Sequence, residues 1–187
     1  YSCLGYFIML FRSLLCVCFV LWTSFIHADE TWSHFRGDAG DGRADDAQLP
    51  LEISEGVNVK WKVPISGRGW SSPVIWKDQL WLTTATEDGV KMSAICIDRR
   101  TGKTLHDIVV FKNALDDIRF RHPTNSYASP TPALEAGTLY VHFGSYGTAA
   151  IDTATGKKKW ERRDFQCNHW RGPAASPVID GDRIIIC

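Results

Sequence analysis

The chain has 187 residues, of which 44% are hydrophobic, 12% aromatic and 22% charged. This composition is typical of a folded protein and excludes collagen-like, low-complexity and disordered chains. Lys and Arg together number 21, and Asp and Glu also number 21. Because the formal charges balance, no whole-chain field favours nucleic acid or an anionic membrane surface, and we expect no nucleic-acid partner.

The first 28 residues have the pattern of a secretory signal peptide. Arg12 precedes the short apolar run 14–22, and the small residue Ala28 stands where cleavage is expected. An uncleaved membrane anchor is the alternative, because residues 6–26 are apolar apart from Arg12 and are nearly long enough to span a bilayer. The charge within that run favours the signal peptide. We therefore expect residues 1–28 to be removed on export to the periplasm or the extracellular space, leaving no stable membrane span.

Three cysteines, Cys96, Cys167 and Cys187, follow the expected cleavage position. An odd number leaves at least one thiol without a partner inside the chain. No spacing is Cys-x-x-Cys, so we expect no zinc site. Buried cysteines on strands, acting as small hydrophobic residues, are the favoured interpretation.

Two markers repeat along the exported part of the chain. Residues 96–106 align with residues 150–160 at a constant shift, with Asp, Thr, Gly and Lys in common. A Ser-Pro pair that opens an apolar strand recurs at Ser72, Ser129 and Ser176. Two markers that interleave with a period of about 50 residues indicate a repeat architecture.

Each repeat has the pattern of four short strands. Ser-Pro opens the first, and a polar turn leads to a second such as 79–84, which is rich in β-branched and aromatic residues. The third ends at Asp98 or Asp152, whose side chain can bond turn amides, while Gly102 or Gly156 supplies the positive φ of a tight hairpin. Four-stranded repeats of this length predict the blades of a β-propeller. A β-sandwich is the all-β alternative, but a sandwich needs no repeated marker.

The exported chain is too short for a closed ring. A propeller needs roughly four to eight blades, so we expect an all-β, incomplete N-terminal portion of about two and a half blades. An N-terminal segment, 29–56, leads into a partial propeller at 57–187. Its expected parts are a closing strand at 57–65, a blade at 72–111, a blade at 129–165 and an incomplete blade at 176–187.

The repeat also carries a family resemblance. The pattern Ala-x-Asp-x-x-Thr-Gly-x-x-x-Trp, complete at 150–160, resembles the repeat of the pyrroloquinoline quinone (PQQ) type propellers, and the copy at 96–106 departs from it with Cys96 and His106. The wider pattern is similar to exported bacterial PQQ-binding-like β-propeller repeat proteins, and it comprises residues 32–37, 60–64, 67–73, 125–130 and 167–173. This family includes quinoprotein dehydrogenases, an outer-membrane assembly scaffold and members with no assigned reaction.

No catalytic motif of the GxSxG, HExxH, Walker or GxGxxG kind is present, and the acidic segment 38–46 misses the EF-hand spacing. We therefore expect no catalytic residue and no metal site in this chain. The leading hypothesis is a non-catalytic exported scaffold or ligand-binding module. The alternative is the N-terminal part of a PQQ-dependent alcohol or sugar dehydrogenase whose catalytic blades lie beyond residue 187, with PQQ as a cofactor by resemblance alone.

Polar and aromatic residues precede each Ser-Pro pair, in segments that should lead into the innermost strands and line the mouth of the channel. Aromatic faces with Arg, Asn and His donors would hold a small planar or sugar-like ligand by stacking and hydrogen bonding. For the module as a whole, the expected partners are other proteins or such a ligand. The alternative is that these groups satisfy the loop backbone and neighbouring blades. The candidate binding residues are Arg68, Trp70, His122, Asn125, Tyr127, His169 and Arg171.

Overall fold

The computed structural model describes residues 31–44 and 48–187, so the predicted signal peptide at 1–28 lies outside the described residues. Within those ranges the chain is built of antiparallel strands with two short 3-10 helices, and none of its helices is long and apolar enough to cross a membrane. The strands form three sheets and no closed sheet within the described residues. The predicted all-β fold of an incomplete propeller is therefore confirmed.

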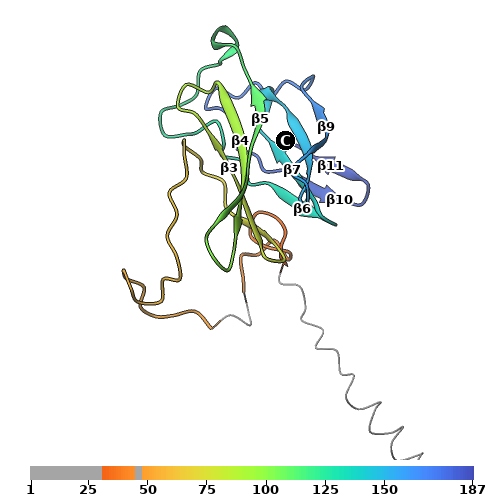
Figure 1. Ribbon diagram of the computed structural model, residues 1–187. Coiled ribbons are helices and arrows are strands. Elements are labelled where there is room, and N and C mark those ends of the chain that lie inside the picture. The colour runs from red at the N-terminus through yellow and green to blue at the C-terminus, as the bar shows by residue number, and fades with distance from the viewer. Residues whose placement is uncertain (1–30, 45–47) are drawn as a thin grey trace, which may run out of the picture.

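The first sheet has the order β1-β2-β3-β4-β5 and the second β6-β7-β8-β9, while β10 and β11 form a hairpin. In Figure 1 the two larger sheets stand side by side, and the orange segment 48–60 loops away from them. The element bounds are β1 Thr31–Trp32, β2 Val74–Trp76, β3 Gln79–Ala85, β4 Lys91–Asp98, β5 Thr104–Lys112, η1 Leu115–Asp117, β6 Ala133–Glu135, β7 Thr138–His142, η2 Gly144–Tyr146, β8 Thr148–Asp152, β9 Lys158–Arg162, β10 Val178–Asp180 and β11 Arg183–Ile185.

The core lies between the two larger sheets. Side chains on both faces of β4 and β8 are buried. Trp81 and Met92 of the first sheet belong to the same buried cluster as Leu139 of the second sheet and Phe143, which directly follows β7. The ring of Phe143 meets that of Phe111 edge-on at 5.9 Å between centroids, a favourable geometry for aromatic pairs. Apolar side chains buried between the two blades therefore hold the two sheets together.

The structure corrects the predicted alignment of the Ser-Pro markers. The Ser72 amide donates to the Thr131 hydroxyl at 3.0 Å, and the Thr131 amide donates to the Ser176 hydroxyl at 3.0 Å. Thr131-Pro132, and not Ser129-Pro130, is thus the equivalent pair, since it directly precedes β6. The Ser129 hydroxyl instead donates to Asn125 Oδ1 within its own loop. Counted back from Ser72 and Ser129, Arg68 pairs with Asn125 and Trp70 with Tyr127. Counted back from Thr131, these pairings shift by two residues and no longer hold.

The predicted hairpin turns are confirmed in both repeats. Gly102 has φ +74° and Gly156 has φ +69°. The carboxylate of Asp98 accepts from the Thr101 amide and hydroxyl at 2.7 and 2.9 Å, and Asp152 accepts from Thr155 in the same way at 2.9 and 2.8 Å. These hydrogen bonds hold the pKa of both carboxyls below the ordinary value.

A side chain from the preceding repeat covers each of these glycines. A Cβ on Gly102 would lie 2.8 Å from Cγ of Trp61, and a Cβ on Gly156 would lie 2.9 Å from Nδ1 of His106. His106 also stacks on Trp81, with centroids 5.7 Å apart. His106 therefore fills the place of the repeat tryptophan. Trp61 covers Gly102 in the same way as His106 covers Gly156. Residues 57–65 join no sheet apart from a single bridge at Val57, so the closing strand stays a prediction.

The N-terminal segment adds a strand that the sequence did not predict. Thr31–Trp32 pairs with β2 in antiparallel register, and the Leu134 amide of β6 donates to the Ser33 carbonyl at 2.7 Å. Asp38 closes the segment by accepting from the Thr31 hydroxyl at 2.6 Å and the Ser33 amide at 2.7 Å. This short segment therefore joins the first strands of two successive blades.

Candidate functional site

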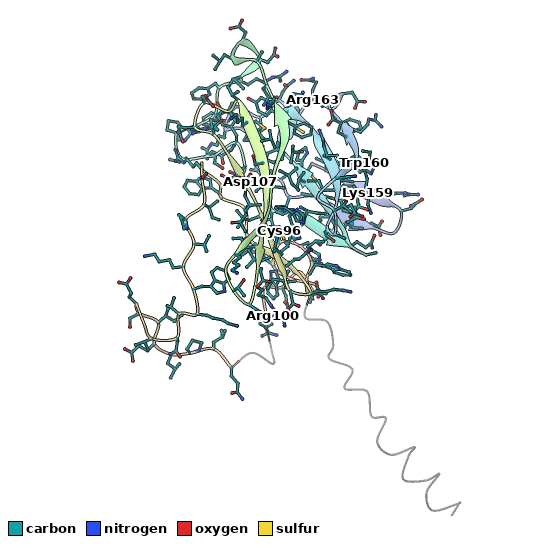
Figure 2. The ribbon with its side chains drawn as sticks, viewed as in Figure 1. Cys96, Arg100, Asp107, Lys159, Trp160 and Arg163 are labelled. Atoms are coloured by element: carbon teal, nitrogen blue, oxygen red, sulfur yellow. The ribbon has the colours of Figure 1, made fainter. Side chains whose placement is uncertain are left out.

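The antiparallel order of the strands sorts the connections onto two ends of the blades. The Asp-Thr-Gly hairpins lie at one end, marked by Arg100 in Figure 2, and the connections marked by Arg163 lie at the other. We name the second the loop end; it comprises residues 66–73, 86–90, 113–132, 143–147 and 163–177. All seven predicted binding residues lie at the loop end.

Asn125 links two of these connections and has no side-chain capacity to spare. Its Nδ2 donates to the carbonyls of Arg171 at 2.7 Å and Pro173 at 3.1 Å. Its Oδ1 accepts from the Ser126 amide at 2.8 Å and from the Ser129 hydroxyl. Asn125 therefore positions the loop end and is not free to bind a ligand.

Tyr127 is likewise part of the scaffold. Its ring is buried, meets Tyr146 edge-on at 5.8 Å and lies against Gly89, where a Cβ would come within 2.9 Å of the ring. Its hydroxyl donates to the Arg119 carbonyl at 3.2 Å. The guanidinium of Arg121 lies 4.9 Å from its ring centroid. Tyr127 thus supports an arginine rather than presenting an open face.

Arg68 and Trp70 connect the first segment to the middle one. The Arg68 guanidinium lies 4.9 Å from the Trp70 ring centroid, and its Nη2 donates to the Pro123 carbonyl at 3.0 Å. Trp70 Nε1 donates to the Thr124 carbonyl at 3.1 Å, yet 52% of Trp70 is exposed. The indole is therefore fixed in orientation and open to solvent.

His122 and Arg171 lie against a second exposed indole, that of Trp170, and His169 directly precedes Trp170 in the chain. His122 meets Trp170 edge-on at 5.7 Å, and the Arg171 guanidinium lies 4.6 Å from the Trp170 ring. His122 Nδ1 pairs with the Thr124 hydroxyl at 2.7 Å, and His169 Nδ1 accepts from the Arg171 amide at 3.3 Å. Trp170 itself is 60% exposed.

The structure therefore brings the seven candidates to one end of the blades in two groups, joined through residues 119–127, and their role in binding stays a prediction. It also shows residues that the sequence analysis missed, above all Phe120, Arg121, Trp170 and Glu87. The available sequence signal was Arg119-Phe120-Arg121, in which an aromatic residue stands between two arginines outside the predicted strands.

Arg68, Arg121 and Glu87 line a shallow depression of about 350 Å³, together with Phe120, Pro123 and Tyr127. Glu87 Oε1 accepts from Arg68 Nη1 at 3.1 Å and from Arg121 Nη2 at 2.5 Å. The hydrogen bond from Arg121 holds the pKa of Glu87 below the ordinary value, so this carboxylate is ionised at neutral pH.

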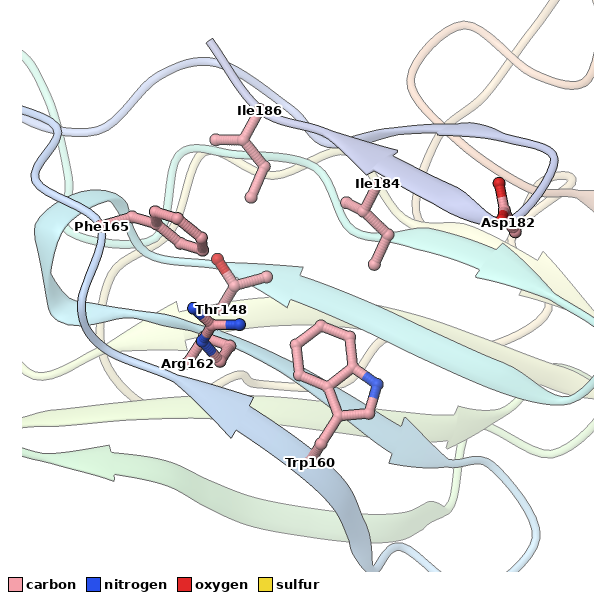
Figure 3. Close-up of a pocket in the computed structure, with 7 residues that line it drawn as sticks. All are labelled: Thr148, Trp160, Arg162, Phe165, Asp182, Ile184 and Ile186. Carbon is pink, nitrogen blue, oxygen red and sulfur yellow. The ribbon is translucent and has the colours of Figure 1, made fainter.

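A second cavity of about 450 Å³ lies between the second sheet and the β10–β11 hairpin. Figure 3 shows Trp160 and Arg162 on one side of it and Ile184 and Ile186 on the other. Trp160 is the tryptophan of the complete repeat motif, the counterpart of Trp61 and His106, which cover the turn of the following blade. We therefore regard this cavity as an interface between blades.

The cysteines differ in their surroundings. Cys96 is fully buried in β4, and burial raises its pKa to about 12, which confirms the interpretation of a small hydrophobic strand residue for this thiol alone. Cys167 lies in a loop with its Sγ 3.8 Å from Nε2 of His142, and Cys187 is exposed, so that interpretation is wrong for both. Burial lowers the pKa of His142 to about 4, which keeps the imidazole neutral.

A family model described as outer membrane protein assembly factor BamB matches residues 51–187. No curated protein matches significantly. Among solved structures, a europium-containing methanol dehydrogenase is 13% identical with a TM-score of 0.44, over 61% of this chain and 19% of that one. A quinohemoprotein alcohol dehydrogenase from Comamonas testosteroni is 18% identical with a TM-score of 0.42, over 64% of this chain and 17% of that one.

The chain therefore spans less than a fifth of the length of those two enzymes. The family match covers most of the chain and includes every candidate binding residue. The chain belongs to the PQQ-like repeat family described as outer membrane protein assembly factor BamB.

Proposed function

We propose that this chain forms part of an exported, non-catalytic binding module whose loop end contacts a partner protein. The observation that carries this proposal is the exposure of three aromatic rings at one end of the blades. Trp70 is 52%, Trp170 60% and Phe120 70% exposed. Two of the rings, the indoles, each lie against an arginine guanidinium.

Such a surface has the composition of a protein interface. Trp and Arg are enriched among the residues that dominate binding energy, because a large ring buries much area at little entropic cost. Part of the entropic cost of ordering these rings is already met before a partner binds. Trp70 is fixed by its hydrogen bond to the Thr124 carbonyl, and Asn125 ties the middle segment to the segment that carries Trp170. The rings are thus preorganised for contact.

The family description, that of an assembly factor, supports a protein as the partner. A PQQ site finds less support in these residues. The polar atoms of Asn125 and Tyr127 are engaged within the protein, and guanidinium groups lie against the Trp70 and Trp170 rings. The described residues therefore do not fit a quinone cradle.

Export is part of the proposal because residues 1–28 have the signal-peptide pattern. N-terminal sequencing of the secreted protein tests it. We expect the mature chain to begin at or near Asp29. A mature protein that begins far from this position, or that is retained in the membrane through residues 6–26, would contradict it.

The binding proposal is tested with the double variant Trp70→Ala/Trp170→Ala in the full-length protein. Cross-linking in the native cell envelope, followed by mass spectrometry, should show specific partners for the wild type and at least a tenfold loss for the variant. Phe35→Ala is the matched control, since Phe35 is also a half-exposed ring beside an arginine but lies in the N-terminal segment. Equal capture by the wild type and the double variant, or no specific capture by the wild type, would overturn the proposal.

A further inference from the structure

The depression at the loop end places two arginines around a single carboxylate. Both guanidinium groups donate to the same oxygen, Oε1 of Glu87. One carboxylate thus serves two cations, and the group of three keeps a net positive charge. An arrangement of this kind favours a further anion, or an anion in place of the one present.

The two arginines are held in place without Glu87. Arg68 Nη2 donates to the Pro123 carbonyl at 3.0 Å, and Arg121 Nη1 donates to the Asn125 carbonyl at 2.8 Å. The ring of Tyr127 supports the Arg121 guanidinium from one side. Both guanidinium groups therefore stay in position when Glu87 moves away, as a preorganised site requires.

Arg121 needs an anionic partner more than a surface arginine does. Its side chain is only 10% exposed, and its Nε is buried without a hydrogen-bond partner among the described residues. A buried guanidinium without a partner is costly, so an anion at this position is retained strongly. Because the Nε lies inside the protein, its missing hydrogen bond adds to the cost of leaving this guanidinium without an anion.

The side chain of Glu87 is free to move away from the two arginines. Its side chain is 65% exposed, and it stands in the turn that joins β3 to β4. Asp88 closes this turn, accepting from the Thr86 hydroxyl at 2.5 Å and the Val90 amide at 3.0 Å, and Gly89 donates to the Thr86 carbonyl. Glu87 contributes no bond to the turn, so a change of its rotamer leaves the backbone intact.

We propose that Arg68 and Arg121 bind an Asp or Glu carboxylate of a partner protein, which displaces Glu87, so that Glu87 acts as an internal competitor. This inference rests on the proposed binding role of the loop end. The depression is shallow and bordered by exposed Phe120, and the Trp70 ring lies against Arg68. An acidic residue flanked by apolar side chains therefore fits the surface better than an isolated small acid.

The test uses the peptide acetyl-Phe-Glu-Phe-amide, its Gln counterpart and free glutarate, each titrated into the full-length protein by calorimetry. We expect the Glu peptide to bind at least fivefold more tightly than the Gln peptide, and less tightly as salt increases. Glu87→Gln should tighten the Glu peptide by about 3- to 10-fold and leave the Gln peptide unchanged. Glu135→Gln, an equal charge change at the hairpin end, is the control. Arg68→Gln should abolish the preference for Glu.

Equal binding of the Glu and Gln peptides, or no effect of Glu87→Gln, would overturn this inference. Glutarate that binds as tightly as the Glu peptide would also overturn it, in favour of a small-anion site. None of these three results affects the cross-linking experiment with Trp70→Ala/Trp170→Ala. If the double variant loses capture and the peptides show no preference for Glu, the binding role is retained and the displacement of Glu87 is refuted. If capture is unchanged and the peptides do show a preference for Glu, the binding role is refuted and the displacement of Glu87 is retained.

Discussion

Replacing Gly156 with Ala tests whether a residue of one blade docks on the turn of the next. Gly156 has φ +69°, and an added Cβ would lie 2.9 Å from Nδ1 of His106 and 3.3 Å from Cδ1 of Ile108. Gly137 provides the matched control. Its φ is +74°, but a Cβ there would meet only the Thr153 hydroxyl, at an ordinary contact distance of 3.6 Å.

The two substitutions share one cost and differ in another. Holding Ala in the left-handed region costs on the order of 1 kcal/mol at either position. Gly156→Ala adds overpacking of about 1–3 kcal/mol, because His106 is stacked on Trp81 and cannot retreat without losing that contact. We therefore expect a loss of about 1 kcal/mol for Gly137→Ala and about 2–4 kcal/mol for Gly156→Ala.

The assay is the free energy of unfolding of the full-length protein, measured by urea denaturation. A double variant, His106→Ala/Gly156→Ala, isolates the docking contact. It should lose less than the sum of its two single variants, because the new methyl then faces a vacated space. Equal losses for Gly137→Ala and Gly156→Ala, or additive losses in the double variant, would refute docking of His106 on Gly156.

Three further outcomes are expected. Burial holds the folded-state pKa of His142 near 4, below the ordinary value of 6.5, so between these pH values the unfolded chain binds a proton that the folded chain does not. The free energy of unfolding therefore falls as pH drops from 6.5 to 4, by about 1.4 kcal/mol per pH unit at most. His142→Gln should reduce this pH dependence, measured by urea unfolding across the range. Trp61→Ala removes the ring over Gly102 and should speed proteolysis of residues 57–65, whereas Leu51→Ala, at a fully exposed position, should not. Thr131→Val keeps the shape but removes the acceptor for the Ser72 amide, and calorimetry should show a loss of about 1–3 kcal/mol; an unchanged melting curve would show that this bond between blades contributes little.

The hairpin turns were predictable because their chemistry is local. Asp98 and Thr101, or Asp152 and Thr155, lie three residues apart and bond to each other and to the turn amides. A repeat of these residue types is therefore sufficient evidence for a repeat of the turn. The blade count and the all-β fold followed from this pattern without any knowledge of tertiary contacts.

The start of the second blade was not predictable in the same way. Ser129-Pro130 and Thr131-Pro132 both match the local pattern of a strand-opening pair. Only the hydrogen bonds from Ser72 to Thr131 and from Thr131 to Ser176 distinguish them, and these join residues far apart in the sequence. A marker defined by neighbours in sequence cannot show which of two adjacent copies faces the next blade.

The candidate site depends on the same kind of distant information. Asn125 and Arg121 stand four residues apart in one loop, and both are polar residues with several donors. Asn125 uses its side chain on the carbonyls of Arg171 and Pro173, whereas Arg121 keeps a buried Nε without a partner and shares Glu87 with Arg68. A positioning residue therefore differs from a binding residue in the hydrogen-bonding capacity that its side chain keeps after bonding to the backbone of the neighbouring blade. The types of residue that precede a strand in the sequence cannot show this capacity. Arg121 shares its carboxylate with Arg68, and for that reason this pair of guanidinium groups is the place where a partner should make its most selective contact.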